Sequence, residues 1–194
     1  MTQFRTVLLA FSSLSIAYAQ NRASTPPSGP KTRIEAFESQ AGTVIVRGYS
    51  KAGELKGVFG GVVRVQAMEF ADATNGKKEY GIGIDVTETD RIERSNRSFI
   101  DYDEIASLLK GIEYVSKLDK SVTPLEQFQA DFRTKGDFRV STFSSSTRNN
   151  EIMATISSGS IGETSVFVRM ADLLKFRDIV VSAKGMVDSA RTPK

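Results

Sequence analysis

The side chains best placed for acid–base chemistry are the carboxylates of Asp101, Asp103 and Glu104. Two carboxylates that lie about 5 to 9.5 Å apart can act as acid and base in the hydrolysis of a glycosidic bond. The same cluster stands at the start of an apolar segment with helical spacing, where free backbone N–H groups and the helix dipole stabilise negative charge. Asp101 followed three residues later by Glu104 also approximates a capping box. We therefore expect a structural role at a helix start, with hydrolysis as the alternative.

Basic residues form the second group, because they can bind phosphates or another acidic polymer. One set recurs at every third residue in the segment 90–98, where Asp90 and Glu93 cancel much of its charge, so we expect a solvated loop there. The other set surrounds a predicted hairpin in the second half, where Phe143 is out of phase with Phe138 and Val140 and could stack with a base. The candidate ligand-binding residues are Arg91, Arg94, Arg97, Arg133, Lys135, Arg139, Arg148 and Phe143.

The residue types that the chain lacks exclude several classes of enzyme and metal site. With no His and no Cys, it cannot form a Ser-His-Asp triad, a thiolate nucleophile, a zinc site of His or Cys ligands, or a disulfide. The turn at 72–76 superficially resembles a calcium loop but lacks the later acidic ligands. The formal net charge of +3 is too small to indicate a nucleic-acid binder by itself. We expect no metal, no cofactor and no enzymatic activity.

The segment 1–19 has the organisation of a secretory signal peptide. Its only charge is Arg5, which precedes a short apolar stretch and the ending Ala17-Tyr18-Ala19, so we expect cleavage after Ala19. The alternatives are a transit peptide and an uncleaved anchor. Residues 20–32, rich in Pro, Ser and Thr, are expected to form a flexible leader. No later segment has the roughly 18 apolar residues of a membrane helix, so we predict a secreted or periplasmic protein without a membrane span.

Apolar periodicity predicts the elements of the first half, in which strands precede a helix. Residues alternate in character over 63–68 and 80–86, and Asn75-Gly76 between these runs indicates a tight hairpin. Gly81 and Gly83 give the second run one small face, which is typical of a bend or bulge and less often of a close approach by backbone or ligand. A short strand near 97–100 leads into a helix expected from Asp101 to Leu118.

The second half repeats this order of elements. Ile112 of the first helix corresponds to Val180 of the second, and both are expected to be buried in a core that the two sheets share. The strands and the final helix are expected at about Phe128–Phe132, Phe138–Thr142, Ile152–Ile156, Ser165–Val168 and Met170–Val187.

Val166-Phe167-Val168, followed by Leu173-Leu174-Lys175-Phe176-Arg177-Asp178, is similar to the last strand and helix start of a Pur repeat. The order of elements also resembles the paired ββββα repeats of the Whirly and Pur-type single-stranded nucleic-acid-binding folds. The resemblance implies curved sheets with helices behind them. We predict an α+β fold of two ββββα repeats, in which two amphipathic helices pack on antiparallel sheets. The single domain covers 33–190, with units at about 33–122 and 123–190.

Two functions remain open. The first is an exported, non-enzymatic binding or structural module with an unknown protein or polyanion as partner. The alternative is a Whirly/Pur-like protein that binds single-stranded nucleic acid or another polyanion, with an affinity that falls steeply as salt rises. Because the families in question bind nucleic acid inside cells, the export signal disfavours nucleic acid as the partner. The Asn96-Arg97-Ser98 sequon matters only in a eukaryotic source.

Overall fold

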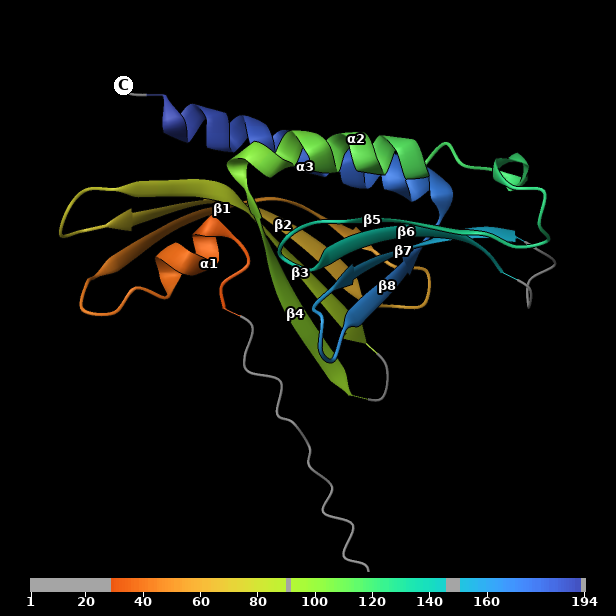
Figure 1. Ribbon diagram of the computed structural model, residues 1–194, viewed down its shortest axis with the longest axis horizontal. Coiled ribbons are helices and arrows are strands. Elements are labelled where there is room, and N and C mark those ends of the chain that lie inside the picture. The colour runs from red at the N-terminus through yellow and green to blue at the C-terminus, as the bar shows by residue number, and fades with distance from the viewer. Residues whose placement is uncertain (1–28, 90–91, 146–150, 193–194) are drawn as a thin grey trace, which may run out of the picture.

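A computed structural model of the chain describes residues 29–89, 92–145 and 151–192 (Figure 1). The expected signal peptide, most of the expected leader, and the candidates Arg91 and Arg148 lie outside the described residues. The elements are α1 (Arg33–Glu38), β1 (Ile45–Lys56), β2 (Val62–Asp72), β3 (Lys78–Thr89), β4 (Glu93–Asp101), η1 (Tyr102–Glu104), α2 (Ile105–Val115), η2 (Lys120–Val122), β5 (Gln129–Arg133), β6 (Phe138–Ser145), β7 (Glu151–Ser158), β8 (Thr164–Val168) and α3 (Met170–Arg191).

The strands form two antiparallel sheets in chain order, β1-β2-β3-β4 and β5-β6-β7-β8, and each sheet is followed by a helix. Figure 1 shows α2 and α3 side by side over the two sheets. The predicted α+β class, with two helices packed on antiparallel sheets, is confirmed. The hairpin predicted at Asn75-Gly76 is also present, with Gly76 at a φ of 71° between β2 and β3.

One hydrophobic core joins both units. The inward side chains of each sheet meet the apolar stripes of α2 and α3, and Ile112 and Val180 are fully buried within this core, as predicted. Each sheet therefore has one face toward the helices, which we call the inner face, and an opposite outer face. Alternation along the strands assigns every strand residue to one of the two faces.

The helix α1 was not predicted, and it covers part of the outer face of the first sheet. A capping box between Thr32 and Glu35 starts this helix, and its Ile34 and Phe37 pack with Met68 and Phe70 in a second, smaller core. Six residues with two buried apolar side chains are too few to show a helical period. The capping bonds and the packing, which no periodicity reveals, stabilise the helix instead.

The glycines of β3 mark close packing, and the bulge that the sequence offered as one reading of Gly81 and Gly83 is absent. The β2–β3 and β3–β4 registers run without a shift through both residues. A Cβ at Gly81 would lie 2.5 Å from Ile34 Cδ1 of α1, and one at Gly83 would lie 2.6 Å from Met68 Sδ. The small face of β3 therefore makes room for the protein's own side chains.

The carboxylate cluster is structural, but its predicted capping box is absent. The side chain of Asp101 accepts hydrogen bonds from the backbone N–H groups of Arg33 at 2.9 Å and Ile34 at 3.2 Å, in the first turn of α1. Glu104 Oε1 accepts from the N–H of Lys135 at 2.9 Å. Neither carboxylate caps α2, which begins only at Ile105, after the 3₁₀ turn η1.

Two further sequence predictions need correction. The segment with Arg94 and Arg97, expected as a solvated loop, belongs to strand β4, which pairs with β3 along its length. The first helix is shorter than expected, because α2 ends at Val115 and a loop with the 3₁₀ turn η2 leads to β5. None of the helices in the described part of the chain is long and apolar enough to cross a membrane.

Candidate binding face on the second sheet

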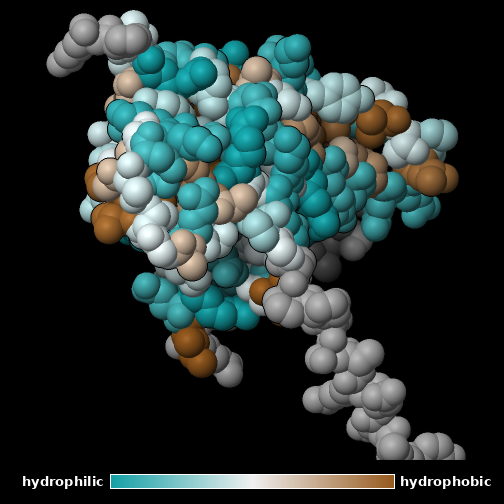
Figure 2. Space-filling view, turned by 60° about the vertical axis from the view of Figure 1, so that its left-hand side comes forward, coloured by the Kyte–Doolittle hydropathy of each residue, from teal (hydrophilic) through white to brown (hydrophobic). Residues whose placement is uncertain are grey.

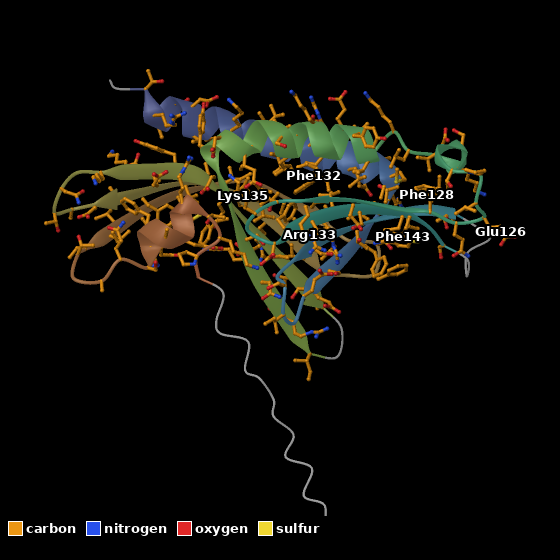
Figure 3. The ribbon with its side chains drawn as sticks, in the orientation of Figure 1. Glu126, Phe128, Phe132, Arg133, Lys135 and Phe143 are labelled. Carbon is orange, nitrogen blue, oxygen red and sulfur yellow. The ribbon has the colours of Figure 1, made fainter. Side chains whose placement is uncertain are left out.

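The outer face of the sheet β5–β8 brings together three of the predicted site residues. Arg133 and Arg139 lie directly opposite each other on β5 and β6, and Phe143 lies four residues further along β6 on the same face. Figure 3 shows Phe132 on the side of α2, whereas Arg133 and Phe143 lie on the opposite side of the sheet. Alternation along β5 and β6 thus separates the core phenylalanines from the candidate site, as the sequence indicated.

Three phenylalanines form an aromatic row on this face: Phe59, Phe167 and Phe143. The ring centroids of Phe143 and Phe167 are 6.3 Å apart and those of Phe59 and Phe167 are 5.7 Å apart, both in edge-to-face geometry. Phe59 is 55% exposed and Phe167 is 39% exposed, while Phe143 is half-buried beside Met153 of β7. Exposed rings in contact with one another provide an apolar surface that retains access to a partner.

A glycine-rich loop between β1 and β2 holds Phe59 against the second sheet. The N–H of Val58 donates to the carbonyl of Phe167 at 2.8 Å, so this loop attaches to the edge of β8. Gly61 has a φ of +76°, and a Cβ there would lie 2.7 Å from the carbonyl oxygen of Thr87. Only glycine fits this position without strain. The aromatic row therefore contains residues from both units of the fold.

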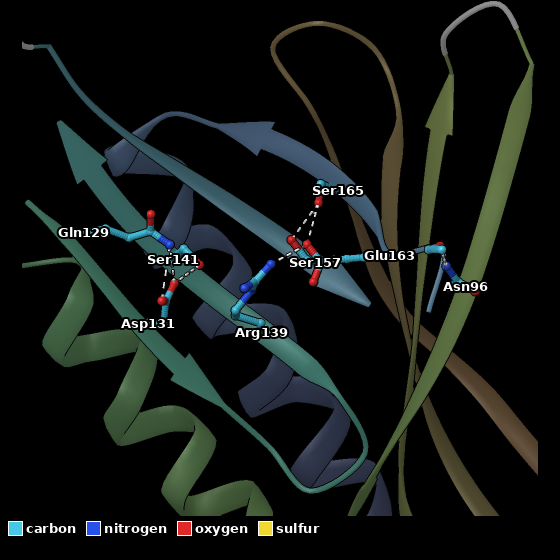
Figure 4. A network of polar contacts seen from close by, with 9 residues as sticks. Asn96, Gln129, Asp131, Arg139, Ser141, Ser157, Glu163 and Ser165 are labelled. Atoms are coloured by element: carbon cyan, nitrogen blue, oxygen red, sulfur yellow. Dashed lines mark hydrogen bonds and ion pairs between the residues drawn. The ribbon is translucent and has the colours of Figure 1, made fainter. Parts of the chain in front are cut away.

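A polar network lies on the second sheet, and Figure 4 shows its members. Arg139 forms an ion pair with Glu163, whose carboxylate also accepts from the hydroxyl of Ser165 at 3.3 Å. Ser165 in turn shares a hydrogen bond of 2.8 Å with Ser157. The Arg139 side chain is mostly buried, and its Nε has no hydrogen-bond partner among the described residues. Arg139 is thus a fixed part of the sheet, and its charge is compensated by Glu163.

Asp131 lies on the same face and stays ionised. Burial alone would raise the pKa of this carboxyl, but hydrogen bonds from Ser141 and Gln129 and the nearby charges of Arg139 and Arg133 outweigh it, so the pKa lies below its usual value. A carboxylate with these donors keeps its negative charge at neutral pH. The outer face consequently contains both signs of charge.

The two described arginines of β4 belong to the other sheet and are already paired. Arg97 donates to both carboxylate oxygens of Asp85, at 2.6 and 2.7 Å, and the hydrogen bonds with Asp85 raise the pKa of this guanidinium. Arg94 pairs with Glu88 at 3.2 Å. The structure therefore does not join them to Arg133, Arg139 and Phe143 in one basic surface.

Three cations around the second sheet form no ion pair with any residue that the structure describes. Arg133 lies on the outer face, and Lys135 lies in the turn between β5 and β6. Arg169 follows β8 on the outward phase of that strand, just before α3, and lines a hollow of about 470 Å³ together with Met153 and Val58. These cations are available to a partner.

Sequence reasoning missed Phe59, Phe167 and Arg169 as site residues. Val166 and Val168 are both buried, so alternation along the strand directs Phe167, which lies between them, to the outer face. This alternation was the sequence signal that could have identified Phe167. The same phase continues to Arg169. Phe59 had no comparable signal, because it lies in a loop whose contact with β8 depends on the tertiary fold.

The remaining candidate groups make contacts within the protein. Asn96 of the sequon lies within β4, and its side-chain nitrogen donates to Gly162 O at 2.8 Å and to Thr164 Oγ1 at 2.7 Å, which joins the two sheets. Asp72 accepts hydrogen bonds from Thr43, Thr74 and Asn75, so its turn is closed by protein donors. Within the described residues, no cluster of three or more acidic side chains could hold a metal ion.

Comparison of the chain with protein families, with curated proteins and with solved structures gave no match.

Proposed function

We propose that this protein is an exported, non-enzymatic module that binds a protein partner through the outer face of β5–β8. The observation that carries the proposal is the aromatic row of Phe59, Phe143 and Phe167. Aromatic side chains, Met and Arg are the residue types enriched where proteins bind one another. Met153 lies opposite Phe143, Arg169 follows Phe167 on the same phase of β8, and Arg133 lies on the same face further along the sheet, so the composition of this face fits such an interface.

The charges of this face favour a protein over a polyanion. Binding to a nucleic-acid backbone needs several uncompensated cations along one groove. Here Arg139 is compensated by Glu163, and Asp131 adds a stable negative charge. A partner surface with an apolar centre and mixed charges around it matches this arrangement better.

A capture experiment with paired variants tests the proposal. The purified chain is immobilised and exposed to an extract of the source cells, and the retained proteins are compared between the wild type, Phe167→Asp and Leu174→Asp. Leu174 is an exposed apolar residue of α3, so it controls for the loss of apolar surface. We expect Phe167→Asp to reduce retention of a defined partner at least tenfold and Leu174→Asp to leave it unchanged. Equal retention by all three proteins, or loss with Leu174→Asp alone, would count against the proposal.

The second candidate is binding of single-stranded nucleic acid, and Arg133 and Lys135, at the turn end of the β5–β6 hairpin, favour it because neither forms an ion pair with a described residue. The likeness in element order to the Whirly and Pur families points in the same direction. A fluorescent oligo(dT) in an anisotropy titration separates the two functions. Tight binding that weakens steeply with salt, and that Arg133→Ala and Phe167→Ala both reduce, would favour the second candidate.

A further inference from the structure

Strand β1 is a long, open edge of the first sheet. It covers twelve residues, and among the described strands it pairs only with β2. Its side chains at 46–51 are all exposed, with Val46 at 55% and Tyr49 at 68%. Such an edge presents unpaired N–H and C=O groups that another strand can use, and proteins usually keep edge strands short for that reason. This surface is separate from the outer face of β5–β8.

The helix α3 packs above β1 and leaves room beside it. A hollow of about 370 Å³ is lined by Gly48, Ser50 and Ala67 from the strands and by Met186 and Ala190 from the helix. Gly48 has no side chain and Ser50 has a small one, so both residues leave space on the inner face of β1. A strand added at this edge could place larger apolar side chains there, beside the exposed Met186.

We propose that two copies of this chain join through β1, antiparallel, around a two-fold axis at Gly48. The hydrogen-bond pattern of the strand allows this register. Ala73 donates to the carbonyl of Val44 at 2.9 Å, so alternation directs the backbone groups of Val44, Val46 and Gly48 toward β2. The groups of Arg47 and Tyr49 then point to the open edge. With the axis at Gly48, Arg47 of one copy pairs with Tyr49 of the other through these edge groups.

Charge selects this register over its immediate neighbours. An axis at Arg47 would place that residue opposite its own copy, and an axis at Tyr49 would place Arg47 opposite Lys51 of the second copy. Like charges directly opposite each other destabilise paired strands. Within one copy Arg47 pairs with Glu38 and Lys51 with Glu54, both at 2.7 Å, which weakens the repulsion without removing it. The axis at Gly48 avoids both like-charge pairs and places Arg47 opposite a tyrosine ring, where a cation–π contact is favourable.

In this register the inner face of β1 in one copy fits the inner face of β1 in the other copy by side-chain size. Val46 of one copy lies opposite Ser50 of the other, so a larger side chain meets a smaller one at two symmetric places. A two-fold contact needs this self-complementarity, because each residue pair occurs twice. Val46 and Tyr49, both exposed in the single chain, become covered.

Disulfide trapping tests both the partner and the register, since the chain contains no Cys of its own. A Cβ at Gly48 would meet only Glu69, at 3.8 Å or more, so Gly48→Cys fits the fold. At the axis the two Cα atoms would be about 4.5 Å apart, which is within disulfide range. Val46→Cys is the matched control, because the two copies of residue 46 would be roughly 13 Å apart along the strands.

We expect the wild-type chain to sediment as a dimer at high micromolar concentration, and Gly48→Cys to form a covalent dimer under mild oxidation while Val46→Cys does not. Tyr49→Lys should shift the wild-type equilibrium toward monomer, because it places a second cation opposite Arg47. A wild-type monomer at these concentrations would overturn the proposal. Cross-linking of Val46→Cys in place of Gly48→Cys, or a Tyr49→Lys protein that dimerises like the wild type, would overturn the register.

Discussion

The carboxylate of Asp101 holds a helix that lies 68 residues earlier in the chain. Asp101 is almost fully buried, and the first N–H groups of a short helix have no partners within that helix. The two carboxylate oxygens of Asp101 accept hydrogen bonds from the N–H groups of Arg33 and Ile34 and so provide the missing partners. A sequence pattern indicated that negative charge belonged at this place, but it assigned the charge to the wrong helix, since the partner is distant in sequence.

The substitution Asp101→Asn tests this role. The amide can offer only one acceptor atom and turns its NH₂ group toward backbone donors, so we expect a loss of about 1–3 kcal/mol in the free energy of unfolding. Hydrogen exchange of the amides in 33–38 should accelerate at the same time. Asp103→Asn is the control, because this side chain is half exposed and, among the described residues, its ion pair is with Arg33 on the surface. Equal stability of the two variants would show that Asp101 does not anchor α1.

The ion pairs of the candidate site also required the structure. From the sequence alone, alternation indicated that Phe143 is out of phase with Phe138 and Val140, and a basic set was expected around the hairpin. The pairing of Arg139 with Glu163 and of Arg97 with Asp85 depends on where neighbouring strands begin and on their register. No short-range pattern specifies that register. Counting the basic residues of the sequence therefore overestimates the positive charge that is left without an ion-pair partner.

At the scale of elements, the helices α2 and α3 and most strands followed from periodicity because each has one buried face. The apolar steps of α2 and α3 and the alternation of β2, β3 and β6 each extend over enough residues to define a phase. Strand β1 lacked this signal, since nearly all of its side chains are exposed. The open edge of β1 became visible only in the sheet.

The two glycines within helices provide a matched test of how α2 packs on β5. A Cβ at Gly111 of α2 would lie 2.3 Å from the ring of Phe132, whereas one at Gly185 of α3 would meet no atom within 4 Å. We expect Gly111→Ala to destabilise the protein by about 1–3 kcal/mol through overpacking. Gly185→Ala should stabilise it by about 0.5–1 kcal/mol, because alanine has the higher helix propensity. Urea unfolding measures both, and a stabilising Gly111→Ala would mean that α2 does not lie this close to β5.

At the scale of the whole molecule, the two proposed surfaces belong to different sheets. The face of the molecule in Figure 2 is largely hydrophilic, with hydrophobic side chains gathered in small separate groups. A dimer formed through β1 would therefore leave one β5–β8 face available on each copy. Such an arrangement would present two binding faces to a partner and raise its apparent affinity without any new contact within one copy.

The central claim is that a partner binds at the aromatic row, and site-specific photo-cross-linking in the source cells tests it most directly. The photoreactive residue p-benzoylphenylalanine replaces Phe167 in one variant and Leu174 in another, both at exposed apolar positions but on opposite sides of the second sheet. The account predicts a discrete adduct from position 167 and none from position 174. An adduct from position 174 alone, or no adduct from position 167 while the variant is folded and exported, would contradict it.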